Sequence, residues 1–150
     1  IRWEQDGVKR KARLDELITI SQHHAMVVDV KTTSTVGPKD WAKHCWNYGY
    51  RKQGAWYRDA ARSLGFTQVD WLYIVIEKSP PNDVYVYLAT EEELAIGERE
   101  NNEILAEMAA CRESGIWTRP EQRGVAENPL PPWVRLPEIL SSGGRPVAVH

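Results

Sequence analysis

A carboxylate and an amine lie two residues apart inside an otherwise apolar segment, Asp29-Val30-Lys31. Side chains two apart on a β-strand share a face, so Asp29 and Lys31 would project together while Val28 and Val30 face the opposite way. Burying a charge is expensive unless the charge is paired or binds a metal ion. Two interpretations stay open: a simple ion pair on an edge strand, or a pair of groups held in place for chemistry.

A second carboxylate, Asp15, precedes Asp29 at a spacing that suits a hairpin or a neighbouring strand. If the two carboxylates converge, they repel each other and either share a proton or bind a divalent cation. Oxygen ligands select Mg²⁺, Mn²⁺ or Ca²⁺ rather than zinc, and the backbone carbonyl of Val30 could add a ligand on the same side. If the carboxylates bind a cation rather than share a proton, the candidate metal ligands are Asp15, Asp29 and Val30.

A glutamine and a tyrosine, Gln53 and Tyr57, are four residues apart in a segment with a helical pattern. Residues at this spacing are neighbours on one helix face, and Tyr50 and Trp46 extend the same stripe. An ordinary solvated helix face can carry such a pair, so this pair alone does not distinguish a site from a surface.

The chain before Asp29 has the pattern of β-strands. Asp6-Gly7 stands between alternating runs and predicts a hairpin turn, with a second strand over residues 8–17. Residues 25–32 are β-branched and mostly apolar on both sides, which predicts a strand buried in a sheet.

The segment that carries Gln53 predicts one helix over residues 39–64, ended by Gly65. Gly49 and Gly54 weaken such a helix, so something other than propensity must hold it, or something must approach its backbone closely. Two strands (69–77 and 84–89) and a helix from Thr90 to about Ser114 follow, the helix opening with a capping box.

Composition is that of a globular domain with its own core: 150 residues, 42% hydrophobic and 27% charged. No apolar run approaches the ~20 residues that span a bilayer, so we expect no membrane partner. Two cysteines exclude a disulfide framework and favour a reducing, cytoplasmic setting. Residues 1–63 carry a net charge of +5 and residues 64–150 a net charge of −7. The basic part suggests a phosphate-bearing partner, or is ordinary solvated surface.

Taken in order, Arg13-Leu14-Asp15, Asp29-Val30-Lys31 and Gln53-xxx-Tyr57 resemble the motif series of the PD-(D/E)xK nuclease superfamily. The Gln-xxx-Tyr element is similar to that of its RecB-type branch. Residues 28–33 and 47–57 most closely resemble the RecE-type phage exonucleases (exodeoxyribonuclease VIII). The resemblance covers about residues 1–115. It implies two Mg²⁺ ions, with Mn²⁺ as the alternative, and hydrolysis of a DNA phosphodiester.

The resemblance also implies an α/β fold: a central mixed β-sheet flanked by helices, the restriction-endonuclease-like core. We expect this nuclease core over residues 1–115 and a C-terminal extension over residues 116–150. The family's core opens with a helix that often carries a further Glu or His. This chain begins after that point and without Met, so we expect a core that lacks the first helix. Either that helix lies upstream in a longer protein, or the ligand set is reduced.

Roles for individual residues follow from the same resemblance. Lys31 would orient water or neutralise charge on the phosphoryl group, and Gln53 and Tyr57 would position the scissile strand, beside the carboxylates of Asp15 and Asp29. Contacts to the DNA strand, mostly to its phosphates, are expected from Lys9, Lys11, Arg13, Tyr50, Arg51, Lys52 and Arg58. The acidic helix over residues 91–107 should lie away from the DNA.

The expected function is a Mg²⁺-dependent exonuclease that degrades double-stranded DNA from a free end, 5′ to 3′, in phage-type recombination. RecE-type members form rings and work beside a single-strand annealing protein, and the setting would be the cytoplasm of a bacterial or phage-infected host. The alternatives are an endonuclease or junction-cleaving member of the superfamily, and a non-catalytic DNA-end-binding subunit. A generic alternative is an interaction domain whose seven Trp residues form a sticky surface.

Overall fold

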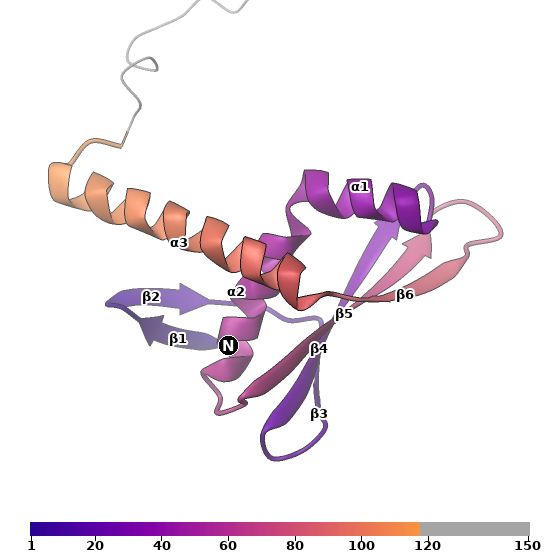
Figure 1. Ribbon diagram of the computed structural model, residues 1–150, viewed down its shortest axis with the longest axis horizontal. Coiled ribbons are helices and arrows are strands. Elements are labelled where there is room, and N and C mark those ends of the chain that lie inside the picture. The colour runs from indigo at the N-terminus through magenta and orange to yellow at the C-terminus, as the bar shows by residue number, and fades with distance from the viewer. Residues whose placement is uncertain (118–150) are drawn as a thin grey trace, which may run out of the picture. The chain divides into compact units, whose positions relative to one another are not determined.

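Six strands and three helices make up residues 1–117, the part of the chain that the computed structural model describes (Figure 1). In chain order the elements are β1 (Arg2–Gln5), β2 (Val8–Lys11), β3 (Glu16–Thr19), β4 (His24–Thr33), α1 (Pro38–Tyr48), α2 (Tyr50–Arg62), β5 (Gln68–Glu77), β6 (Val84–Leu88) and α3 (Glu91–Ser114). Ile1–Gly115 forms one compact unit. The extension predicted for residues 116–150 lies outside the described residues from position 118 on.

The main sheet has four strands in the order β3-β4-β5-β6. The two central strands, β4 and β5, run parallel and place Asp29 level with Tyr73. Both outer strands are antiparallel to their neighbours, so the sheet is mixed. The predicted α/β fold with a central mixed sheet is confirmed. β1 and β2 form a separate hairpin, whose turn at Asp6-Gly7 has the positive φ angles of 51° and 71° that the dipeptide predicts.

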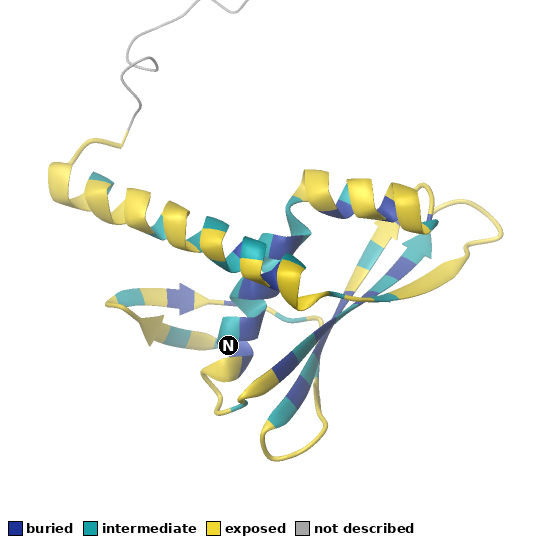
Figure 2. Ribbon diagram, in the orientation of Figure 1, coloured by how far each residue is buried: buried dark blue, intermediate teal, exposed yellow. Residues whose placement is uncertain are grey.

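One face of the main sheet carries the core, and Figure 2 shows the buried positions along β4 and β5. Val27 of β4 and Trp71, Tyr73 and Val75 of β5 alternate onto this face and are at most 1% exposed. Each helix adds apolar side chains to the same cluster: Trp41 and Cys45 from α1, Ala61 from α2, and Leu94 from α3. All three helices therefore cover the face to which Asp29 belongs, because Asp29 is two residues from Val27 on the same strand.

The single strand predicted over residues 8–17 is wrong. β2 ends at Lys11 and β3 begins at Glu16, because the two pieces pair in different sheets. β2 pairs with β1 in the hairpin, whereas β3 pairs with β4 in the main sheet. The residues between them cross from one sheet to the other, and the last of them is Asp15, directly before β3.

The single helix predicted over residues 39–64 is also wrong, because Gly49 divides it into α1 and α2. Gly49 has φ 67° and ψ 31°, a left-handed conformation that ends one helix and starts the next. The close approach expected at the other glycine is confirmed: a Cβ on Gly54 would lie 2.9 Å from Leu94 and 3.4 Å from Trp71.

α3 begins as predicted, with the backbone N–H of Glu93 donating to Thr90 Oγ1 at 3.1 Å. It packs on α2 so closely that a Cβ on Gly97 would lie 2.0 Å from the carbonyl oxygen of Arg51. In the described part of the chain, no helix combines the length and apolarity that a bilayer crossing requires.

Candidate active site

β4 presents Asp29 and Lys31 together on the helix-covered face of the sheet. Asp29 is 2% exposed, and its Oδ2 faces the ammonium of Lys31 in an ion pair. The Lys31 side chain is 15% exposed, so the ammonium lies at the boundary between core and solvent. The pair lies on a central strand, so the alternative of an ion pair on an edge strand does not apply.

Gln53 of α2 bridges the two members of this pair. Its side-chain oxygen accepts a hydrogen bond from Lys31 Nζ at 3.0 Å, and its Nε2 donates to Asp29 Oδ1 at 3.2 Å. An amide can do both because it carries an acceptor and two donors. The helix therefore orients both charged groups at once, and the solvated-helix interpretation of Gln53 does not apply.

Asp15 reaches the same place from the start of β3. Glu16 is level with Val28 in the β3–β4 ladder, so Asp15 comes level with Asp29 one position further on. The β3–β4 ladder ends at Glu16, and beyond it the backbone N–H of Val30 donates a hydrogen bond to the side chain of Asp15, at Oδ2, over 3.0 Å. Because the N–H and C=O of one strand residue point to the same side, the Val30 carbonyl lies on the side of β4 from which Asp15 approaches.

The electrostatics of Asp29 reflect this crowding. Burial raises the pKa of Asp29 above its ordinary value, the hydrogen bond and charge of Lys31 oppose the rise, and the negative charge of Asp15 adds to it. Added positive charge between the two carboxylates would favour their ionised forms. The arrangement is therefore one that a cation would stabilise.

The donor set fits a hard divalent cation. Two carboxylates, from Asp15 and Asp29, and one backbone carbonyl, from Val30, are oxygen ligands of the kind that Mg²⁺ prefers, and Mg²⁺ commonly keeps water or phosphate oxygens in its other positions. Within residues 1–117, no group of three His, Cys, Asp or Glu side chains is close enough to hold a metal. Asp15 and Asp29 are therefore candidate acidic ligands without a third beside them in the described part of the chain.

Two tyrosines of α2 have different surroundings. Tyr50 lies beside the site, with Lys31 Nζ 4.6 Å from the centroid of its ring. Tyr57, one helical turn beyond Gln53, is half-buried and packs edge-on against Trp71 with ring centroids 5.7 Å apart. Trp71 pairs with Val27, two positions before Asp29, so Tyr57 packs beside the core next to the site rather than on the charged pair itself.

The basic residues fall into two groups. Lys9, Lys11 and Arg13 are exposed, as the alternation of the second hairpin strand predicts, and Lys52 is half-buried. Arg51 and Arg58 are 8% and 3% exposed, and their guanidinium groups are engaged inside the fold. The expectation that these two arginines meet DNA phosphates is corrected, because buried guanidinium groups held by carboxylates do not reach a ligand.

The partners of the two arginines come from the acidic helix α3. Arg51 binds Glu100 with its Nη2 2.7 Å from Oε1, and Arg58 binds both Glu91 at 2.9 Å and Glu98 at 3.0 Å. The acidic helix therefore lies directly against α2 rather than apart from the basic residues. Its carboxylates neutralise charge within the fold.

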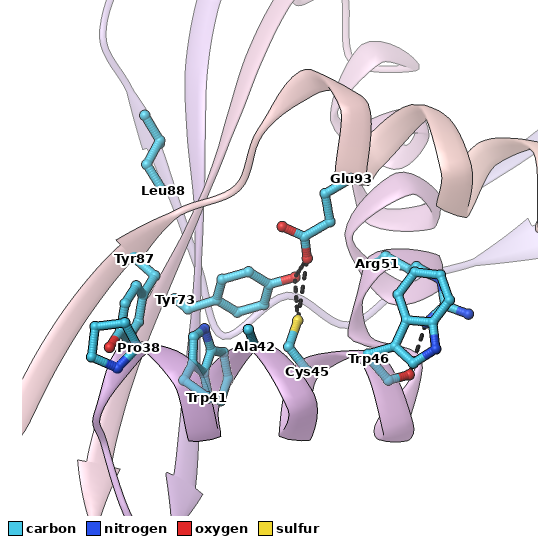
Figure 3. A pocket seen from close by; sticks show the side chains of 10 residues that line it. All are labelled: Pro38, Trp41, Ala42, Cys45, Trp46, Arg51, Tyr73, Tyr87, Leu88 and Glu93. Atoms are coloured by element: carbon cyan, nitrogen blue, oxygen red, sulfur yellow. Dashed lines mark hydrogen bonds between the residues drawn. The ribbon is translucent and has the colours of Figure 1, made fainter.

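A polar cluster that the sequence interpretation missed lies between α1, α3 and β5 (Figure 3). The carboxylate of Glu93 accepts hydrogen bonds from Tyr73 at 2.9 Å and from the thiol of Cys45 at 3.2 Å, beside an aromatic cavity of about 340 Å³. Burial and the charge of Glu93 raise the pKa of Cys45 to about 12. The capping box gives Glu93 a local role only, and no local pattern predicts its two tertiary partners.

Comparisons with known proteins agree with this architecture. A family profile described as a PDDEXK-like domain of unknown function (DUF3799) matches residues 1–127. No curated protein matches the chain at a significant level. Among solved structures, a “putative exonuclease” from Eubacterium rectale superposes with a TM-score of 0.54 at 20% sequence identity. The match covers 87% of this chain and 52% of that chain, so the chain spans about half the length of this structural relative.

A mixed sheet whose adjoining strands bring Asp15 up to Asp29-Val30-Lys31 defines a protein of the PD-(D/E)xK class. The chain belongs to the PDDEXK-like family whose profile covers residues 1–127. The superfamily predicted from the three motifs is confirmed. The narrower RecE-type assignment stays a prediction.

Proposed function

We propose that this chain is the core of a metal-dependent deoxyribonuclease, and specifically of an exonuclease acting on double-stranded DNA. The observation that carries the proposal is the joining of Asp15, Asp29, Lys31 and Gln53 by contacts between three elements, β3, β4 and α2. Membership of a PDDEXK-like family and the similarity to a protein described as an exonuclease both support a nuclease.

The carboxylates of Asp15 and Asp29 and the carbonyl of Val30 would hold Mg²⁺, with Mn²⁺ as the alternative. When bound, such an ion supplies an acidified water and stabilises charge on the reacting phosphate. Asp29 is held for this role by Gln53 on one oxygen and by Lys31 on the other. Asp15 accepts a hydrogen bond from the N–H of Val30 with its Oδ2, so its Oδ1 takes no part in that bond.

Lys31 is placed to act on the phosphate. Its ammonium has three donors, of which one direction is taken by Asp29 and one by Gln53. The third makes no hydrogen bond to either of them, and it can hold a water or a phosphate oxygen beside the ring of Tyr50, at the boundary with solvent. A fixed positive charge at that point would neutralise negative charge as it develops on the phosphoryl group.

The first test is the substitution Asp29→Asn. It removes a carboxylate ligand while keeping the shape and the hydrogen bond to Gln53, so Mg²⁺-dependent cleavage of linear duplex DNA should fall by at least about 10²-fold. Cleavage is followed on a gel with an end-labelled duplex, and the melting temperature shows that the fold persists. Asp83→Asn, at an exposed turn residue, is the matched control and should cleave like the parent. Full activity of Asp29→Asn would refute the site.

The choice between exonuclease and endonuclease is made with covalently closed circular DNA. An exonuclease leaves the circle intact and degrades the same DNA after linearisation, whereas an endonuclease or junction-cleaving enzyme nicks the circle. No metal-dependent cleavage of either form would favour the non-catalytic alternative, a DNA-end-binding subunit. Only two acidic ligands within residues 1–117 make that alternative worth testing.

Resemblance alone carries the finer features of the proposal: 5′-to-3′ polarity, a ring-shaped oligomer, a single-strand annealing partner and a role in phage-type recombination. Polarity is read from duplexes labelled at one 5′ end or one 3′ end, since a 5′-to-3′ enzyme releases the 5′ label first. Sedimentation velocity of the protein tests the ring.

A further inference from the structure

Three ring side chains gather in one cluster beside Lys31, here called the aromatic ladder: His44 and Tyr48 of α1 and Tyr50 of α2. The rings of His44 and Tyr50 are 5.8 Å apart at 52°. The rings of His44 and Tyr48 are 4.3 Å apart at 27°, and those of Tyr48 and Tyr50 are 5.8 Å apart at 26°. The hydroxyl of Tyr50 also lies 3.4 Å from His44 Nε2. The ladder ends at the ammonium of Lys31, which lies over the ring of Tyr50.

Gly49 makes the ladder possible. In a continuous helix, residues two apart point to nearly opposite sides, so Tyr48 and Tyr50 could not stack. The left-handed conformation of Gly49 changes the direction of the chain between them. The break in the helix therefore turns two tyrosines that are two residues apart, Tyr48 and Tyr50, toward the same place next to the candidate active site.

Tyr48, the most exposed of the three rings, is 68% exposed, whereas His44 and Tyr50 are half-buried. An aromatic ring that stacks on its neighbours and still leaves most of its surface in water has room for one more planar group. Hydrophobic packing does not account for this position, because the core cluster of the described residues includes Tyr50 and not Tyr48.

A polar notch of about 310 Å³ adjoins the ladder. Residues 33–35, at the end of β4 and just beyond it, form one wall with three hydroxyl side chains, and α1 forms the other with Asp40, Lys43 and Asn47. His44 and Tyr48 line the same notch. Hydroxyl, amide and ammonium donors beside a stacking surface are the combination that holds a sugar and phosphate next to a stacked base.

We propose that the aromatic ladder binds an unpaired base of the substrate strand, in the nucleotide next to the phosphate held at Lys31, with that nucleotide's sugar and phosphate in the adjoining notch. This inference rests on the proposed nuclease function and names its substrate class: the DNA strand must be single-stranded at this position. A base inside a duplex has both faces covered by its neighbours, so it can stack on Tyr48 only after leaving the pair.

The test uses the full chain in EDTA, where binding is measured without cleavage. The probes are a single-stranded dT oligonucleotide with a fluorescent label, and the same DNA with one 2-aminopurine whose emission is quenched by stacking. Tyr48→Ala should weaken binding of the single strand by about 5- to 150-fold and abolish the quenching. Tyr48→Phe keeps the ring and should behave like the parent.

The matched control is Trp46→Ala, which removes another exposed aromatic ring from α1 on the side that faces Arg51. It should leave single-strand binding within about twofold of the parent. Melting curves of all three variants separate loss of binding from loss of fold.

The two proposals fail in different ways. If the parent cleaves DNA but Tyr48→Ala binds and quenches like the parent, the ladder is structural and this inference is refuted while the nuclease function stands. If the parent cleaves no DNA with any divalent ion, the nuclease function is refuted, and with it the substrate role given to the ladder. Equal weakening by Tyr48→Ala and Trp46→Ala would also refute a specific role for the ladder.

Discussion

At the scale of single residues, the ammonium of Lys31 is surrounded by three groups of different chemistry: the carboxylate of Asp29, the amide of Gln53 and the ring of Tyr50. A half-buried ammonium needs such partners because it has lost much of its water. Of the three, only Gln53 contacts both charged groups. Gln53 is therefore a positioning residue, whose loss should loosen Asp29 and Lys31 together.

We predict that Gln53→Ala lowers the rate of Mg²⁺-dependent cleavage by about 10- to 100-fold and raises the Mg²⁺ concentration needed for half-maximal rate. The physical reason is that Asp29 loses the donor that orients it as a ligand. A Mg²⁺ titration of the rate measures both effects, and Gln68→Ala, at the exposed start of β5, is the control. An unchanged Mg²⁺ requirement would contradict the orienting role.

Cys45 gives a prediction that does not depend on the function. With its pKa at about 12, only about one Cys45 thiol in 10⁴ is ionised at pH 8, so iodoacetamide should label the native protein at Cys111 and spare Cys45. Peptide mass spectrometry reads the two sites separately, and both should react in guanidinium chloride. Labelling of native Cys45 as fast as Cys111 would show that the Glu93 cluster does not form.

The same thiol affects stability at high pH. Its pKa in the folded protein lies above the ordinary value of 9.0, so the folded state holds the proton more tightly than the unfolded state. This contribution to stability is present below about pH 9 and declines as the pH rises toward 12.

At the scale of elements, the contact between α2 and α3 holds the helix layer together. Charge pairing joins Arg51 to Glu100 and Arg58 to Glu91 and Glu98, and the backbones approach closely at Gly97. Because α2 also carries Gln53, the packing of α3 on α2 helps to hold Gln53 in place at the site. The charges of α3 act in folding, by neutralising buried arginines, rather than by repelling DNA from a distance.

We predict that Gly97→Ala destabilises the protein by about 1–3 kcal/mol or more, although alanine is the better helix former. The new methyl group would overlap the carbonyl oxygen of Arg51, so α2 and α3 must separate. Urea unfolding measures the change. Gly37→Ala is the control, since a Cβ there meets no atom within 4 Å and its φ of −62° suits alanine. A Gly97→Ala protein as stable as the parent would contradict the close helix contact.

At the scale of the whole molecule, the basic residues of positions 1–63 divide into two groups. Some, such as Arg51 and Arg58, form ion pairs inside the fold, and others lie exposed on the surface. Lys9 and Lys11 are displayed on the hairpin, which is fastened to α2 by the hydrogen bond from Trp56 Nε1 to the Lys11 carbonyl at 3.0 Å. Trp56 lies three residues beyond Gln53. The hairpin therefore holds its exposed lysines near the candidate active site.

We predict that DNA binding weakens by about 40- to 500-fold between 50 and 200 mM salt, as expected for three to five phosphate contacts. The double substitution Lys9→Gln, Lys11→Gln should reduce the salt slope by about 2, because each lysine releases one counterion. Lys78→Gln, at an exposed lysine beyond β5, should leave the slope unchanged. A slope equal in all three proteins would contradict the hairpin contact. Fluorescence anisotropy in EDTA gives the slopes.

Several features could be predicted from the sequence because they depend on neighbours in the chain. The Asp6-Gly7 turn, the apolar strand that carries Asp29 and Lys31, and the Thr90 cap of α3 are local, and the structure contains all three. The spacing of Asp15, Asp29 and Gln53 also indicated the right superfamily, since motif order survives when most other residues change.

What only the tertiary structure decided are the contacts between residues far apart in the chain. Arg51 and Arg58 have the composition of a DNA-binding surface, yet α3 covers them, 33 to 49 residues further along. No local pattern distinguishes an arginine that a carboxylate will bury from one that will meet solvent. The same holds for Tyr48: no local pattern predicts that its exposed ring lies beside Tyr50, which in turn contacts Lys31. Local propensity determines elements, whereas the pairing of charges and rings across elements depends on how those elements pack.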